Sequence, residues 1–222
     1  METVGQRCRR SYSGRRAVTR ARRERTGVVL GFPFHRWCSA VCPLIDRFDR
    51  RVAAVLLEVR EGHAALGRPA AFFARRGPLL FFLEMGVILL VRVTAFPAAG
   101  VQHALRGLTV AVTAAVAAKL VIDPIARRVG RERPFVRMVF RPLVQKDPRD
   151  PSFPSNHAGG AFALAAALAV YFPGWAAASW TLAVALSLAR VFTGVHYVTD
   201  VVAGALIGAA SAVAFSVVLG LR

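Results

Sequence analysis

Charged residues are scarce in this chain of 222 residues, and acidic residues are the scarcest. Asp and Glu number 12 against 30 Lys and Arg, and 19% of the residues are charged whereas 55% are hydrophobic. A soluble domain carries about a quarter charged residues. The shortage of charge therefore argues against a soluble domain and favours a protein that lies in a lipid bilayer.

Cysteine is also rare. The three thiols, Cys8, Cys38 and Cys42, are too few for a disulfide framework. His35 can share a helix face with Cys38 and Cys42, but this set leaves a tetrahedral zinc site without its fourth ligand. We expect ordinary thiols and no metal site.

The net charge of +18 is unevenly placed. Basic residues collect in the first third, which contains RCRRSYSGRRAVTRARRER, and in the middle segment ARRVGRERPFVRMVFRPLVQKDPRD, while the last seventy or so residues are nearly uncharged. A high isoelectric point can indicate nucleic-acid binding. The apolar runs leave no soluble body to present a basic patch, so we expect membrane helices with basic caps and no nucleic-acid partner.

Long apolar runs are abundant. Crossing roughly 30 Å of hydrocarbon takes about 20 helical residues, and five runs come near that length, the third being short. They cover residues 79–96, 104–126, 157–172, 175–192 and 198–221. Ala, Gly and Ser dominate the last three runs, which allows close helix packing in lipid. The pattern predicts an all-α, polytopic membrane bundle of about five transmembrane helices.

Three segments follow from these boundaries. Residues 1–26 are Arg-rich and acid-poor, and we expect a disordered basic arm there, with a transit-like leader or a wrongly chosen start codon as alternatives. Residues 27–78 form a juxtamembrane segment and residues 79–222 the membrane domain. Within the juxtamembrane segment, DRFDRRVAAVLLEVREGH predicts an interfacial amphipathic helix, because apolar residues share one face opposite Arg and Glu. These apolar residues are Val52, Val55, Leu56 and Val59.

Two polar residues in the second run lie one helical turn apart. Lys119 and Asp123 can pair with each other, or Lys119 can reach an anionic ligand. Both alternatives stay open.

Three polar clusters stand at the ends of apolar runs, and helix counting places all of them on one side of the membrane. GRERPF follows the second run, FPSNH begins the third, and ARVFTGVHYVTD joins the fourth to the fifth. The chemically versatile residues of these clusters are Arg131, Arg133, Ser155, Asn156, His157, Arg190, His196 and Asp200.

These residue types suit a phosphate site. Arginine supplies a permanently charged fork of donors that matches phosphate oxygens. Ser155 and the free amides at the start of a helix add donors, and the helix dipole favours an anion there. Gly159 and Gly160 let the backbone come close. The clusters therefore predict a phosphate seat at the membrane surface.

The two histidines predict how the phosphate reacts. His196 and Asp200 are one turn apart, so the carboxylate can hold one ring nitrogen protonated and leave the other free to attack phosphorus. His157 can then protonate the leaving oxygen and activate water in a second step. The arginines stabilise the charge, so no metal or other cofactor is required. Taken singly, such residues are more often solvated caps or topology signals.

At these residues the sequence resembles the type-2 phosphatidic acid phosphatase superfamily of membrane lipid phosphatases. The third family motif, Ser-Arg, five residues, His, three residues, Asp, is matched from Arg190 to Asp200 with Ala189 in place of serine. The second, Pro-Ser-Gly-His, reads Pro154 to His157 with asparagine in place of glycine. The resemblance covers roughly residue 79 to the C-terminus.

The first family motif, Lys, six residues, Arg-Pro, is only partly present. Arg133 and Pro134 fit, but Ala126 stands where the lysine belongs. Arg127, Arg128 or Arg131 can take its place. RERPFV and PSFPSNHAGGAFAL are most similar to the bacitracin-resistance type of undecaprenyl-diphosphate phosphatase.

The resemblance implies a role for each matched residue. Arg133, Ser155 and Arg190 bind phosphate. Apart from the resemblance, the residue types and positions of Asn156, Arg131 and Lys119 make them further phosphate-binding candidates. His196 is the nucleophile, Asp200 orients it, and His157 is the general acid. The implied substrate is a polyprenyl diphosphate, hydrolysed to the monophosphate, with membrane lipids around it.

Several alternatives stay open. The same seat serves a phosphatidic acid or phosphatidylglycerophosphate phosphatase, or a non-catalytic lipid-binding protein; the related haloperoxidases are soluble, unlike this chain. The basic segments would lie in the cytoplasm under the positive-inside rule, whereas the resembling enzymes work on the outer face. Because the catalytic arginines inflate the count, we expect the outer face of a bacterial plasma membrane. The oligomeric state stays open.

Overall fold

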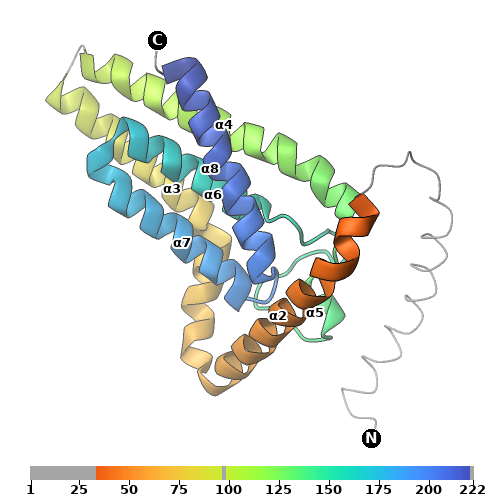
Figure 1. Cartoon of the computed structure of the whole chain (residues 1–222). Coiled ribbons are helices and arrows are strands. Elements are labelled where there is room, and N and C mark those ends of the chain that lie inside the picture. The colour runs from red at the N-terminus through yellow and green to blue at the C-terminus, as the bar shows by residue number, and fades with distance from the viewer. Residues whose placement is uncertain (1–33, 97–98, 221–222) are drawn as a thin grey trace, which may run out of the picture. The chain divides into compact units, whose positions relative to one another are not determined.

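The computed structural model describes residues 34–96 and 99–220 (Figure 1). The predicted basic arm lies outside these residues, as do the side chains of His35, Cys38 and Cys42. The chain divides into two units, Met1–Pro43 and Leu44–Arg222, and the site lies wholly in the second.

Every described element is a helix, which confirms the all-α prediction. The α-helices are α2 (Phe34–Gly62), α3 (Gly67–Ala95), α4 (Ala99–Val129), α5 (Pro134–Arg137), α6 (Asn156–Tyr171), α7 (Ala176–Phe192) and α8 (Val198–Gly220). Single 3-10 turns, η1 (Ala64–Leu66) and η2 (Pro173–Trp175), precede α3 and α7.

Four described segments are long and apolar enough to cross a membrane, where the sequence predicts about five. They are Ala64–Ala95, Ala99–Arg137, Pro173–Phe192 and Val198–Val218. The third predicted run became α6, whose 16 residues span about 24 Å. α6 tolerates this length because α4, α7 and α8 surround it with protein.

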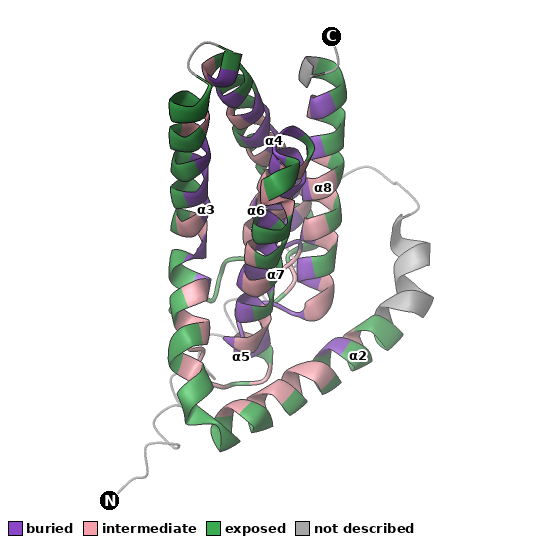
Figure 2. Ribbon diagram, turned by 90° about the vertical axis from the view of Figure 1, so that its left-hand side faces the viewer, coloured by how far each residue is buried: buried purple, intermediate pink, exposed green. Residues whose placement is uncertain are grey.

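α6 is the central helix of the bundle (Figure 2). Its small side chains let α8 approach closely: a methyl group added at Gly204 would collide with the Ser155 carbonyl, and one added at Gly208 with the Gly159 carbonyl. Such contacts between small residues drive helix association in lipid. They fix the start of α6, where the FPSNH cluster lies, against the start of α8.

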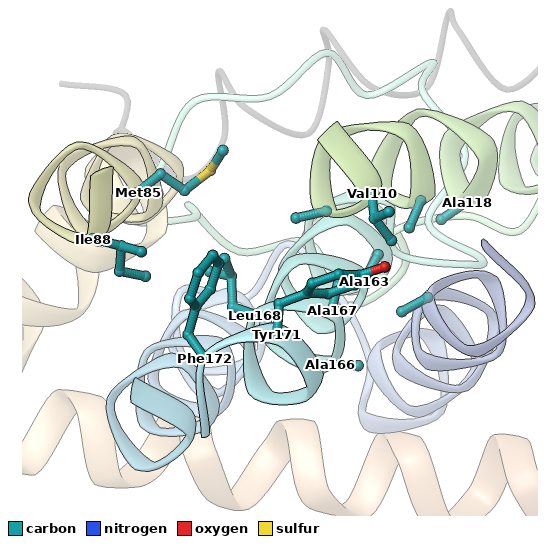
Figure 3. Packing of buried hydrophobic residues seen from close by; sticks show 13 residues of the cluster. Met85, Ile88, Val110, Ala118, Ala163, Ala166, Ala167, Leu168, Tyr171 and Phe172 are labelled. Atoms are coloured by element: carbon teal, nitrogen blue, oxygen red, sulfur yellow. The ribbon is translucent and has the colours of Figure 1, made fainter. Parts of the chain in front are cut away.

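The far end of α6 is held by larger side chains. Figure 3 shows Phe172 and Leu168 between Ile88 of α3 and Val110 of α4. His103 of α4 also contacts this end. Its Nε2 donates a hydrogen bond of 2.9 Å to the Tyr171 carbonyl, because a carbonyl can only accept. The central helix is thus anchored at both ends.

α2 and α3 depart from the predicted segment boundary at residue 78. α3 begins at Gly67 and carries Pro78 inside it. Apolar residues ahead of the proline continue the helix, so the juxtamembrane segment and the first crossing run together. In α2, Val55 and Val59 are exposed whereas Val52 and Leu56 turn partly inward, so the predicted apolar face is split between two surfaces.

Candidate active site

Arg190 lies in the last turn of α7 and is one of the most deeply buried side chains of the described chain, with 1% of its surface exposed. Its Nη1 donates to the Ala74 carbonyl of α3 at 3.1 Å. Nε and Nη2 are buried and have no hydrogen-bond partner among the described residues. Buried polar groups normally find partners, and a buried cation needs one most. The free edge of this guanidinium is therefore shaped for an anion.

Arg133 lies beside it and is held by backbone. Nε donates to the Asp150 carbonyl at 3.1 Å, Nη2 to the Pro151 carbonyl at 3.0 Å and Nη1 to the Val195 carbonyl at 2.9 Å. The two arginines are close enough for their charges to act on one another. Three neutral acceptors fix the fork of Arg133 without cancelling its charge.

His196 lies in the loop between α7 and α8, 4% exposed. Nδ1 is 2.8 Å from the Ser152 carbonyl, which can only accept, so Nδ1 carries the proton. Nε2 then has the free lone pair, and Arg133 Nη1 donates to it at 3.2 Å. The surroundings thus select the tautomer whose Nε2 can attack phosphorus.

The neutral form of His196 is strongly favoured. Burial lowers the pKa of this imidazole from 6.5 to about 4. The guanidinium groups of Arg190 and Arg133 act in the same direction, and Asp200 opposes them. A nucleophile must be unprotonated, and His196 meets that condition at neutral pH.

The predicted partner of His196, Asp200, lies farther from the ring than the Ser152 carbonyl. Its Oδ2 is 3.7 Å from Nδ1, beyond hydrogen-bond distance. Oδ2 instead accepts from the Tyr197 amide at 2.8 Å, and Oδ1 from Arg131 Nη1 at 2.6 Å. Asp200 therefore fixes the backbone around His196. The one-turn spacing brings the carboxylate and the ring near each other but does not set a hydrogen bond between them.

Arg131 is bound by two carboxylates. Its two terminal nitrogens donate to Asp200 and to Asp49 of α2, the latter at 2.7 Å, and its guanidinium stacks 4.1 Å from the centre of the Tyr197 ring. The sequence pattern predicts that Arg131 binds phosphate, whereas in the structure Arg131 bridges two carboxylates.

The start of α6 joins the site through Ser155 and His157. Ser155 caps the helix, its hydroxyl accepting from the Ala158 amide at 3.4 Å, and its own amide donates to the Asp200 carbonyl at 2.9 Å. His157 is the second residue of α6, and the charges of Arg190, Arg133 and Lys146 all act on its ring. The charges of Arg190 and Arg133 thus act on both histidines.

Asn156 and Lys119 form a separate chain of contacts on α4. Asn156 Nδ2 donates to Asp123 Oδ1 at 2.7 Å, and Lys119 Nζ to Asp123 Oδ2 at 2.6 Å. The Lys119 side chain is 62% exposed. Of the two alternatives for Lys119, the structure has the pair with Asp123, so neither residue is brought to Arg190 or His196.

Three residues of this region were not found from the sequence: Asp49, Lys146 and Ser152. Burial lowers the pKa of Lys146 below its usual range, as do the charges of Arg190 and Arg133. No motif marks Lys146, which sits in a loop 13 residues after Arg133. Ser152 acts through its carbonyl, which any residue has.

The motif-one lysine has no clear substitute among the predicted arginines. Arg127 and Arg128 are exposed at the end of α4, and Arg131 is paired. Among the described residues, no group of three or more His, Cys, Asp or Glu side chains could hold a metal ion. The positive charge close enough to act on Arg190 comes from Arg133 and Lys146.

Comparison with known proteins matches the sequence pattern of the PAP2 superfamily to residues 106–222, which include all three polar clusters. Two curated relatives, both named Lipid A 1-phosphatase, come from Rhizobium johnstonii, 35% identical over 95 residues, and Rhizobium etli, 34% identical over 101 residues. These matches cover 40% and 43% of this chain but only 38% and 43% of the relatives, so the chain spans well under half of their length.

Two solved structures share the fold. A transmembrane PAP2-type phosphatidylglycerolphosphate phosphatase from Bacillus subtilis has a TM-score of 0.59 and 22% identity, covering 79% of this chain and 86% of its own. LpxE from Aquifex aeolicus has a TM-score of 0.58 and 21% identity, covering 74% and 92%. At these identities the likeness speaks for the helical arrangement alone.

Proposed function

The chain belongs to the PAP2 superfamily, and from this premise we propose that it is an integral membrane lipid phosphatase working through a phosphohistidine without a metal ion. One observation carries the proposal: the buried guanidinium of Arg190 has two nitrogens without a partner among the described residues, and its charge acts on His196, whose unprotonated Nε2 accepts from Arg133 alone in that part of the chain. A phosphate group supplies the oxygens that Arg190 lacks and the phosphorus that His196 attacks.

The first step breaks the bond between phosphorus and the lipid oxygen. His196 Nε2 attacks phosphorus, Arg133 Nη1 turns from that nitrogen to a phosphate oxygen, and His157 gives its proton to the leaving oxygen. Burial and the nearby cations favour the neutral form of His157 before substrate binds. The lipid phosphate therefore binds as its monoanion and gives its proton to His157, and the resulting dianion offsets those cations. The Ser152 carbonyl accepts from Nδ1 throughout and stabilises the positive ring of the phosphohistidine.

The second step releases inorganic phosphate. His157, now neutral, takes a proton from a water molecule whose oxygen attacks phosphorus and breaks the P–N bond. Arg190, Arg133 and Lys146 stabilise the charge on the transferring phosphoryl oxygens in both steps. Lys146 would then supply the third cation that the incomplete first motif lacks.

Two lipid phosphates are the leading substrates. The names of the curated relatives favour the 1-phosphate of lipid A. The segments RERPFV and PSFPSNHAGGAFAL favour undecaprenyl diphosphate, hydrolysed to the monophosphate, because they resemble that branch. The phosphate-binding residues recognise the phosphate group that both lipids share and do not discriminate between them. Because curated relatives carry the lipid A name, lipid A is tested first and the polyprenyl diphosphate second.

The test is phosphate release by the purified protein in detergent with EDTA. Lipid A, undecaprenyl diphosphate, phosphatidic acid and phosphatidylglycerophosphate are compared, using the native sequence, His196→Ala, and His103→Ala as a control at the far end of α6. Release that disappears only in His196→Ala, with an acid-labile phosphoenzyme, is expected. No release from any lipid, or equal release by the two variants, would overturn the proposal.

We place the site on the outer face of a bacterial plasma membrane. The basic loop overstates the positive-inside signal, because several of its arginines have roles in the fold and the site: Arg131 and Arg137 bind Asp49 and Asp46, and Arg133 is buried. An Arg149→Cys variant without native cysteines should react with an impermeant maleimide in intact spheroplasts. Labelling only after membrane disruption would reject this orientation.

A further inference from the structure

α2 precedes the region matched by the family pattern, residues 106–222, yet it places a carboxylate against the site. The Asp49 side chain has no exposed surface. Its Oδ2 accepts from Arg131 Nη2 at 2.7 Å and from the Thr199 hydroxyl, and its Oδ1 accepts from the Thr199 amide at 3.2 Å. A fully buried carboxylate that accepts from three donors is held in one position by the fold.

The partners of Asp49 are the first turn of α8 and the arginine that binds Asp200. Thr199 is the second residue of α8, so its amide is one of the free donors that a helix N-terminus leaves without an intrahelical partner. Arg131 Nη1 donates to both Asp200 Oδ1 and the Thr199 hydroxyl, at 2.6 and 2.9 Å. Asp49 therefore closes a ring of contacts around Asp200.

This ring extends to the nucleophile. Asp200 Oδ2 accepts from the Tyr197 amide, and Tyr197 follows His196 directly. A cavity of about 10 Å³, the room for one water molecule, is lined by Leu56 and Arg60 of α2 and by His196. α2 thus shares a cavity with His196 and, through Asp49 and Arg131, is linked to the carboxylate that accepts from the next residue's amide.

We propose that Asp49 is a positioning residue of the active site: it holds Arg131 and the first turn of α8 so that Asp200 fixes the backbone of His196. The inference rests on the proposed phosphatase function. Without the Asp49 charge, Arg131 keeps one carboxylate instead of two, and the α8 terminus loses an acceptor. The Nε2 atom then departs from its line to phosphorus, and misplacement by about 1 Å can cost 100-fold in rate.

The alternative is that Asp49 merely docks α2. Asp46, one turn earlier on the same helix, offers a matched control. It is also a paired carboxylate, accepting from Arg137 at 2.9 Å and from Arg50 at 3.0 Å, but it contacts neither α8 nor Arg131. If both carboxylates merely dock α2, neither variant should change kcat or the vanadate effect once the protein is folded.

The experiment compares Asp49→Asn with Asp46→Asn in two assays. The first is kcat and KM for phosphate release from the substrate that the native protein hydrolyses. The second is the rise in melting temperature caused by orthovanadate, whose five-coordinate adduct with a histidine mimics the transition state of phosphoryl transfer and needs no turnover. We expect Asp49→Asn to lower kcat by about 10- to 100-fold at nearly unchanged KM and to lose most of the vanadate effect. Asp46→Asn should stay within about twofold in both.

A second variant covers the case in which Asp49→Asn does not fold. Thr199→Val removes the hydroxyl between Asp49 and Arg131 and leaves their ion pair, and a smaller loss of kcat is expected. If the folded variants match Asp46→Asn in both assays, the positioning role is rejected. If the native protein neither releases phosphate nor binds vanadate, the proposed function fails first, and with it the site that Asp49 would position.

Discussion

Two arginines at the same end of the bundle have opposite surroundings. Arg131 is saturated by two of the scarce carboxylates, Asp49 and Asp200, whereas Arg190 is buried with two nitrogens that have no partner among the described residues. Before folding, both are equally good phosphate ligands. The positions of the few acidic residues decide which arginine forms ion pairs within the fold and which remains available to bind an anion.

Replacing Arg190 should have the largest effect. Arg190→Lys keeps the charge but loses the fork, and a lysine cannot supply both Nε and Nη2 donors. We expect phosphate release to fall by on the order of 100- to 1,000-fold, as for the loss of a donor to a transition-state oxyanion. The measurement is kcat/KM for the released phosphate, with melting temperature as a check on folding.

The matched change at Arg131 sharpens the comparison. Arg131→Lys should lower the melting temperature more than Arg190→Lys does, because two buried carboxylates lose part of their partner. Its direct effect on phosphate binding should be smaller, seen as a preserved stabilisation by orthovanadate. The reverse ranking in vanadate binding would mean that Arg131 contacts the phosphate after opening its ion pairs.

Lys146 should show the next largest effect. Its charge acts on Arg190, Arg133 and the ring of His157. Removal in Lys146→Ala should raise KM and lower kcat/KM by about 10-fold, the scale of one charge-assisted contact to phosphate. Arg141→Ala, an exposed cation in the same loop, is the control for loss of net charge. Equal effects would assign the result to the general field of the loop.

The fold was largely predictable from composition. A shortage of charge and repeated apolar runs specify membrane helices, and these predictions rest on the bilayer as solvent. The length of α6 was harder, because protein on three sides removes the need to match the hydrocarbon thickness. Pro78 was also uninformative as a boundary, since the apolar residues before it continue α3.

The site was predictable in kind and less so in detail. Residue type and motif spacing predicted that Arg133, Arg190 and His196 belong to one site, because the motifs place these residues at neighbouring helix ends. The choice between Asp200 and the Ser152 carbonyl as acceptor for His196 depends on distances of 3.7 and 2.8 Å that spacing does not set. Asp49 was invisible because its partner Thr199 lies 150 positions away along the chain.

The neutral His196 gives a prediction about pH. In the unfolded chain the imidazole keeps its ordinary pKa of 6.5, against about 4 in the folded protein. Between these values the unfolded state binds more protons, so the free energy of unfolding falls as the pH is lowered from about 6.5 to 4. His196→Gln, which does not titrate, should lose part of this dependence. Thermal unfolding in detergent across that window measures it, and identical slopes for both proteins would contradict a buried neutral ring.

The smallest effect is expected at Lys119, the cation that best fits an anion-binding role by residue type and worst by its contacts. Its partner Asp123 is also held by Asn156, so Lys119→Ala leaves that carboxylate one hydrogen bond and removes a mostly exposed ion pair. Exposed pairs contribute little, and kcat/KM should change by about twofold or less. A loss as large as that of Lys146→Ala would show that the pair opens to bind substrate. In that case one lysine would alternate between pairing with Asp123 and binding the substrate. The contacts in the structure would then not decide which cations can bind an anion.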